Sequence, residues 1–244
     1  MYLIHSNIDL KENYMNINEK VGRNIKKYRM AYNLTLKDLS KRLHKSVSTI
    51  SKYENGMISL DISTLLEMSR IFQISPLMII GNESHNTNDS NIPATNIIKN
   101  YMYSYDGSKK KIIKSIIERH ETSSDICHAL LFNDVAESEN PGTCNGFYSG
   151  EFVKDGFLGT YMLHNQISKS EHIIISCVNN LVNPGQKLAL VSGLSNYTML
   201  PVTFKAVILD TEISNLEKIQ PLLSFSKEDF KQMKQTNTLT LQNL

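Results

Sequence analysis

The chain has 244 residues, of which 41% are hydrophobic and 20% charged, and its formal net charge is +2. This composition is typical of a folded chain and excludes a largely disordered one. No stretch reaches the ~18 consecutive apolar residues of a membrane-spanning helix. Residues 1–16 mix charged and apolar side chains, unlike a secretory signal. We therefore expect a cytoplasmic protein with one large or two ordinary domains.

The cysteines give no sign of a stabilising cross-link or metal. Cys127, Cys144 and Cys177 are too few and too widely spaced for a disulfide framework or a structural zinc site. Sparse cysteines of this kind are typical of reduced thiols in the cytosol. We therefore predict free thiols, no metal and no cofactor.

Charge is distributed unevenly along the chain. Residues 1–81 contain 12 lysines or arginines and 7 aspartates or glutamates, a net charge of +5, whereas the remainder carries −3. A basic first third is typical of a part that binds a polyanion such as DNA. The next stretch is rich in asparagine, with Ile92 as its one bulky apolar residue, which indicates a linker. The expected divisions are an extension over 1–18, a DNA-binding domain over 19–81, the linker over 82–96, and a second domain over 97–244.

Between Val21 and Ile80 the apolar residues recur at helical spacing in five short groups. Each of the last four groups follows a residue that commonly caps a helix N-terminus: Thr35, Ser46, Asp61 and Ser75. Gly56 can end the third group, because glycine adopts a left-handed backbone at little cost. The sequence thus predicts an all-α bundle of five helices, with Ile62 and Leu66 on the apolar face of the fourth.

Two short helices joined across Leu43–Ser46 are what a helix-turn-helix requires. The residues around this turn resemble the phage-repressor (Cro/C1, XRE) family of DNA-binding domains over about residues 19–80, most specifically in Ser48–Gly56, STISKYENG. Leu36 and His44 depart from that family, which usually has glutamine and glycine at these positions. Because glycine usually occupies the second position, His44 is expected to adopt a backbone conformation unusual for other residues.

The resemblance implies that the helix after Ser46 lies in the major groove of double-stranded DNA. Val47, Ser48 and Lys52 can project together from it. Ser48 and Lys52 can then reach base edges or a phosphate, and Val47 can pack on a thymine methyl group. Further contacts are expected from Thr35, Thr49, Ser51 and Asn55, the last of them with a phosphate. The alternative is that these side chains simply form a solvated helix face.

Arg29 and Glu54 have a different role in this resemblance. In relatives the matching residues form a partly buried ion pair between the first and third helices. Removal of one partner from such a pair leaves a charge unpaired inside the domain. We therefore expect Arg29 and Glu54 to support the fold rather than to contact DNA.

After the linker the apolar period changes from 3.6 to 2, which is typical of an antiparallel sheet. Eight strands are predicted, over 97–105, 111–119, 125–133, 146–153, 157–164, 173–178, 187–191 and 202–209. Eight strands in this length suit a small barrel or a strongly bent sandwich. A weak helix over 213–223 and a C-terminal helix capped by Ser226 complete the expected fold.

The second domain loosely resembles the uncharacterised C-terminal domains of some bacterial regulators. The match consists of Gly193-Leu194-Ser195 ahead of Pro201-Val202. It implies no particular ligand.

Aromatic residues are concentrated around one predicted hairpin. An eight-stranded barrel can hold a small ligand, and aromatic rings with a few polar groups line such sites. The candidate ligand residues are Tyr148, Phe157, Tyr161 and Tyr197. The alternative is that these rings fill the core.

Four of the seven histidines form two pairs, His120 with His128 and His164 with His172, that could meet across hairpins and bind a metal. Scattered histidines are far more often ordinary strand residues. The prediction of no metal therefore stands.

Taken together, these features predict a sequence-specific transcriptional regulator with no enzymatic activity. Its second domain would sense a small-molecule or protein effector, or join two chains as a homodimer. One alternative is an antitoxin-like regulator whose second domain binds a protein partner. Another is a self-processing repressor, with peptidase residues drawn from Ser149, Ser192, Ser195 and Lys205. No nucleophile motif or cleavage pair supports that chemistry.

Overall fold

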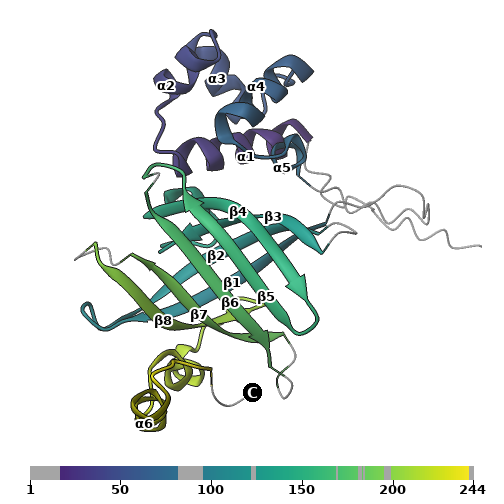
Figure 1. The fold of residues 1–244 in the computed structure, drawn as a ribbon. Coiled ribbons are helices and arrows are strands. Elements are labelled where there is room, and N and C mark those ends of the chain that lie inside the picture. Colours follow the sequence, from purple (N-terminus) through teal and green to yellow (C-terminus); the bar gives the residue numbers. More distant parts are fainter. Residues whose placement is uncertain are drawn as a thin grey trace, which may run out of the picture. The chain divides into compact units, whose positions relative to one another are not determined.

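The computed structural model describes residues 17–81, 96–121, 125–168, 170–180, 183, 185–194 and 199–241 (Figure 1). The chain divides into two compact units, residues 1–26 with 36–81 and residues 27–35 with 82–244. Among the described residues, no helix is both long and apolar enough to cross a membrane. The predicted extension and linker lie outside these residues, except for their last residues, which begin a helix and a strand.

The first part of the chain, here called the helical region, contains the five helices that the sequence predicts. They are α1 (Ile17–Ala31), α2 (Leu36–Arg42), α3 (Val47–Glu54), α4 (Ile62–Phe72) and α5 (Pro76–Ile80). Three of the expected caps are formed. Ser46 Oγ accepts a hydrogen bond from the Thr49 amide at 3.0 Å, and Asp61 Oδ1 accepts one from the Thr64 amide at 2.8 Å. Ser75 caps α5 in the same way.

The core of the helical region is apolar and densely packed. Its buried side chains include Ile25, Leu39, Leu43, Ile50, Tyr53, Met68, Phe72, Met78 and Ile79. A methyl group on Gly22 would lie 2.4 Å from the carbonyl oxygen of Tyr53, so α1 and α3 approach closely at this glycine. Ile62 and Leu66 were expected inside, but they are 76% and 42% exposed. Helix α4 instead buries Thr64, Met68 and Phe72, which share the face opposite Ile62 and Leu66.

His44 adopts the backbone conformation that the sequence predicts for it, with φ of 50°. The left-handed residue reverses the chain between α2 and α3, and the Lys45 amide then bonds to the Ser40 carbonyl at 3.0 Å. A left-handed conformation costs a residue with a Cβ atom about 1–2 kcal/mol. Helix α3 therefore begins where it does at an energetic cost that glycine would avoid.

The second part of the chain forms a closed antiparallel barrel, in which each strand pairs with the next and β8 pairs with β1 (Figure 1). The sequence predicted either a small barrel or a strongly bent sandwich, and the structure is a barrel. All eight predicted strands are present, as β1 (Asn96–Asp106), β2 (Lys111–Glu121), β3 (Ile126–Asn133), β4 (Gly146–Asp155), β5 (Leu158–Asn165), β6 (His172–Asn179), β7 (Gln186–Leu194) and β8 (Pro201–Leu209).

Alternation along each strand decides which side chains enter the barrel. On β6, Ile173, Ile175 and Cys177 are buried, whereas Ile174 between them is exposed. The inward residues form one cluster that includes Met102, Ile117, Leu131, Tyr148, Phe152, Tyr161, Val191 and Ile208. The middle of the barrel is therefore filled by side chains.

The C-terminal segment covers part of the outer wall. It packs on an outward apolar set that includes Tyr103, Leu188, Val207 and Leu209. The weak helix expected over 213–223 is instead two 3-10 turns, Leu216–Lys218 and Gln220–Leu223. Pro221 explains the difference, because it lacks an amide donor and disfavours helical backbone in the residue before it.

The last helix, α6 (Lys227–Thr236), is fastened by a nearly buried carboxylate. Asp229 accepts hydrogen bonds from Lys205 Nζ of β8 at 2.6 Å and from the Ser226 amide at 2.6 Å. Burial opposes ionisation of Asp229, but the bonds from Lys205 and Ser226 outweigh it and hold its pKa below the ordinary value. Lys205 thus anchors the C-terminal helix to the barrel.

Replacement of His44 by glycine should stabilise the helical region by about 0.5–1 kcal/mol. It removes the left-handed penalty, which exceeds the added unfolded-state entropy. Urea unfolding followed by circular dichroism measures the change. Lys41→Gly, at an exposed helical position of α2, is the control and should destabilise by about 1 kcal/mol. Equal losses in the two variants would contradict the strain at His44.

Candidate nucleic-acid interface

Helices α2 and α3 and the turn between them present one polar face to solvent. Ile50 and Tyr53 bury the inner side of α3. The other side of α3 carries Val47, Ser48 and Lys52, which are all exposed; the exposed fraction of Val47 is 43%. These are the three side chains that the sequence predicts in a major groove, and the structure places them on one accessible face.

The start of α3 is ordered by a small network of hydroxyl groups. Ser46 Oγ lies 2.8 Å from Ser48 Oγ and 2.8 Å from Thr49 Oγ1, and it also accepts the Thr49 amide. The contact with Ser46 orients the Ser48 hydroxyl, while its exposed oxygen keeps hydrogen-bonding capacity for a further partner. A polar group held in place in this way loses little conformational entropy when it binds a base edge.

Lys52 and Asn55 differ in how free their side chains are. The Lys52 side chain is exposed and makes no hydrogen bond or ion pair within the described part of the chain. The Asn55 amide nitrogen donates to the Ser51 carbonyl at 2.8 Å, so part of its donor capacity is already used. Thr49 and Ser51 are half-buried, and Thr35 is exposed directly before α2.

Three basic residues that were not predicted as DNA contacts lie beside this face. Lys41 and Arg42 are exposed at the end of α2. Lys45 lies in the turn and reaches Asp61 only at 3.9 Å. Exposed lysines and arginines beside a recognition helix suit phosphate contacts, which position a domain without reading sequence. The charge count of the first third was the signal that pointed to them.

Glu54 is buried and Arg29 is half-buried. Glu54 is 8% exposed, and Arg29 Nη1 donates to the Leu34 carbonyl at 2.8 Å, which closes the chain segment after α1. Both observations agree with a role in the fold. The ion pair between the two residues stays a prediction.

The three described candidate ligand residues do not form one site, because Tyr148 and Tyr161 lie in the interior cluster of the barrel and Phe157 lies outside it. Tyr148 and Tyr161 are 2% and 1% exposed and belong to the packed interior, where Tyr161 lies 4.4 Å from Phe152 between ring centroids. Phe157 is 61% exposed and follows β4, whereas Tyr148 is near the start of that strand. Tyr197 lies outside the described residues.

The histidine pairs lie on neighbouring strands, and His164 is directly opposite His172. In the residues that the structure describes, no three His, Cys, Asp or Glu side chains are arranged to hold a metal ion. Burial lowers the pKa of both His120 and His128.

Most of the peptidase candidates already have partners. Lys205 is bound by Asp229 at 2.6 Å, and Ser192 lies 3.0 Å from Thr203 Oγ1. Ser149 lies 2.9 Å from His128 Nε2, and Ser195 is outside the described residues. Of the two described candidate serines, neither is bonded to Lys205, whose amine shares Asp229 Oδ2 with the Ser226 hydroxyl.

Comparison with known proteins gives a family match for the helical region. Residues 25–79 match the family model described as Helix-turn-helix. No curated protein matches the chain. Among solved structures, the crystal structure of apo-HppE is similar over 78% of this chain and 98% of that one. The identity is 9% and the TM-score 0.27, so this likeness supports no inference about the barrel.

Proposed function

We propose that this chain, with a helix-turn-helix domain at residues 25–79, is a transcriptional regulator that reads duplex DNA through α3. The observation that carries the proposal is the accessible face of Val47, Ser48 and Lys52, above a buried face that fixes the helix in place. Basic residues of α2 and the turn lie beside that face and supply phosphate contacts. The proposal assigns the chain no catalytic role.

A regulator of this kind needs more than one helix-turn-helix domain on its site. Two or three base-reading side chains select too few base pairs for a genomic address, and related domains bind palindromes as pairs. The barrel is the rigid part of the chain available to join two copies. We propose that it forms a homodimer and responds to a signal.

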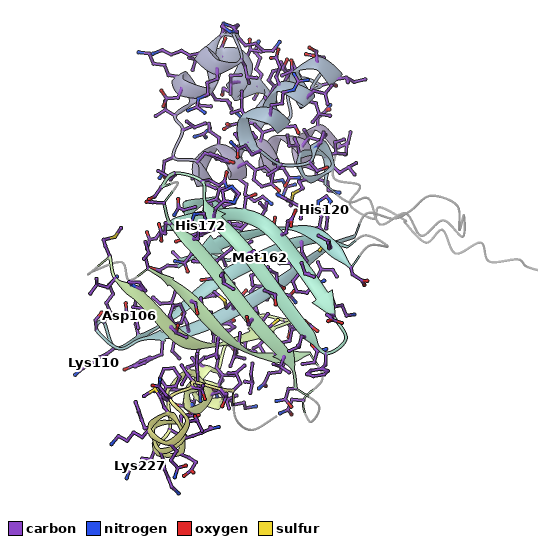
Figure 2. The ribbon with its side chains drawn as sticks, in the orientation of Figure 1. Asp106, Lys110, His120, Met162, His172 and Lys227 are labelled. Atoms are coloured by element: carbon purple, nitrogen blue, oxygen red, sulfur yellow. The ribbon has the colours of Figure 1, made fainter. Side chains whose placement is uncertain are left out.

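The outer wall of the barrel offers a surface for the second copy. Met162 of β5 lies directly opposite Ile174 of β6, and each is 47% exposed (Figure 2). Leu158, on the same outward side of β5, is 46% exposed. Exposed apolar side chains that adjoin one another are typical of interaction surfaces.

Replacement of Ser48 or Lys52 by alanine should weaken binding to the preferred DNA site by about 1–3 kcal/mol and relax preference at particular base pairs. The preferred site is found by sequencing the fragments that the full chain retains, and each variant is then tested against all single-base changes. Ser63→Ala, at an exposed position of α4, is the control and should bind as the parent does. Uniform weakening on every sequence would show that these residues contact only the backbone.

At micromolar concentration the full chain should sediment as a dimer of the 27.7 kDa subunit. Ile174→Lys should shift it toward monomer, because a buried charge in the interface would be unpaired. Leu66→Lys introduces the same charge at an exposed apolar position of α4 and should leave the dimer intact. A monomeric parent, or a dimer unaffected by Ile174→Lys, would contradict this interface.

A further inference from the structure

One end of the barrel, where β2, β4 and β6 finish, contains a pocket of about 130 Å³. Three cationic side chains line it, together with an aromatic ring and a thiol. The lining includes Arg119, Phe152, Lys154, Gly159, Cys177 and Lys187. The β1–β2 turn, marked by Asp106 and Lys110, lies at the other end of the barrel (Figure 2).

Arg119 enters the barrel because it shares the inward side of β2 with Ile117. Its guanidinium carbon lies 4.8 Å from the centroid of the Phe152 ring, and its Nε atom is buried with no hydrogen-bond partner among the described residues. A buried donor without an acceptor costs free energy that a bound anion would recover. The stacked, planar guanidinium suits two-point contact with a carboxylate or phosphate.

The other two cations differ in how far they are compensated. Lys187 Nζ donates to Asp210 Oδ1 at 2.9 Å, and that oxygen also accepts the Asn100 side-chain amide at 2.8 Å. Within the described residues, no carboxylate lies within ion-pair distance of Arg119 or Lys154. The pocket therefore has an excess of positive charge and no acidic lining residue.

Two further lining residues, Gly159 and Cys177, leave the positive charge of the pocket free to bind an anion. A methyl group on Gly159 would lie 2.8 Å from Phe152 Cε2 and 2.9 Å from Cys177 Sγ, so glycine is needed for Phe152 to lie beneath the guanidinium. Burial raises the pKa of the Cys177 thiol. Cys177 is thus a neutral thiol at neutral pH, which leaves the positive charge without a thiolate counter-ion.

We propose that this pocket binds a small oxyanion, a carboxylate or phosphate group, with Arg119 as its main ligand and Lys154 at the entrance. The pocket is slightly smaller than an engineered cavity of about 150 Å³ that holds benzene, so it suits a compact ligand. As an effector site, it rests on the sensing role proposed for the barrel.

The test is a titration of the full chain labelled with 15N-glycine, which has eleven reporters. Sodium phosphate and sodium acetate are added separately, each against sodium chloride at equal ionic strength. The Gly159 and Gly156 amide signals should move saturably with at least one oxyanion, while Gly107 and Gly146 at the far end should not. A response confined to phosphate or to acetate selects that group as the ligand chemistry.

Variants separate a built site from general charge. Arg119→Met should abolish the saturable shift, and Lys154→Met should weaken it about fivefold, as loss of one ionic contact does. Lys234→Met removes an equal charge from exposed α6 and should change nothing. If Arg119→Met does not fold, the Lys154→Met variant provides the test, because the Lys154 side chain is exposed and its replacement should not disturb the fold.

Two results would overturn the proposal. The first is the same response to chloride as to both oxyanions. The second is binding as tight as the parent's in the folded Arg119→Met variant, or in Lys154→Met if Arg119→Met does not fold. DNA retention is measured on the same sample. No saturable shift with intact DNA preference refutes the anion site alone. A saturable shift without DNA retention refutes the proposed DNA binding alone.

Discussion

The placement of α3 depends on the four residues that join it to α2. Leu43 is buried in the core, His44 reverses the chain in a left-handed conformation, and Ser46 caps the new helix. Each of these constraints is local, and together they fix the direction and the first residue of α3. The exposure of Ser48 and Lys52 follows, because helical geometry then leaves them opposite Ile50 and Tyr53. A side chain at the strained position is thus compatible with the fold, at a cost that the surrounding packing offsets.

The barrel depends on a different constraint, which is closure. Pairing of β8 with β1 removes the open edges of the sheet and gives every strand a buried and an outer side. Apolar side chains fill the middle, but the same alternation carries Arg119 inside at one end. The stacked guanidinium, whose Nε has no hydrogen-bond partner in the described part of the chain, makes this end chemically different from the packed centre.

Much of both parts could be predicted from local sequence, because local physics decides it. Capping residues located the starts of α3, α4 and α5, and period-two patterns located all eight strands. Closure into a barrel could not be derived, since it depends on a register between β1 and β8 about a hundred residues apart. Ile62 and Leu66 were misplaced because their apolar character fits a helical stripe, while the buried stripe of α4 includes the polar Thr64.

The candidate sites show the same division. Ser48 and Lys52 could be found because a family resemblance gave their place on one helix. Tyr148, Phe157 and Tyr161 were grouped by composition, but Tyr148 and Tyr161 are inward core residues, whereas Phe157 is exposed between β4 and β5. Arg119 could have been found by counting two residues from Ile117, and a charged residue at an inward position of β2 was the signal that was missed.

The central claim is that the face of α2 and α3 binds DNA, and its salt dependence tests this most directly. Affinity of the full chain for a short duplex is measured over a range of potassium chloride concentrations. We expect a straight line in a log–log plot of affinity against salt, with a slope near −0.9 for each phosphate neutralised, and a slope shallower by about one phosphate in Arg42→Met. An affinity that does not change with salt would contradict DNA binding by this face.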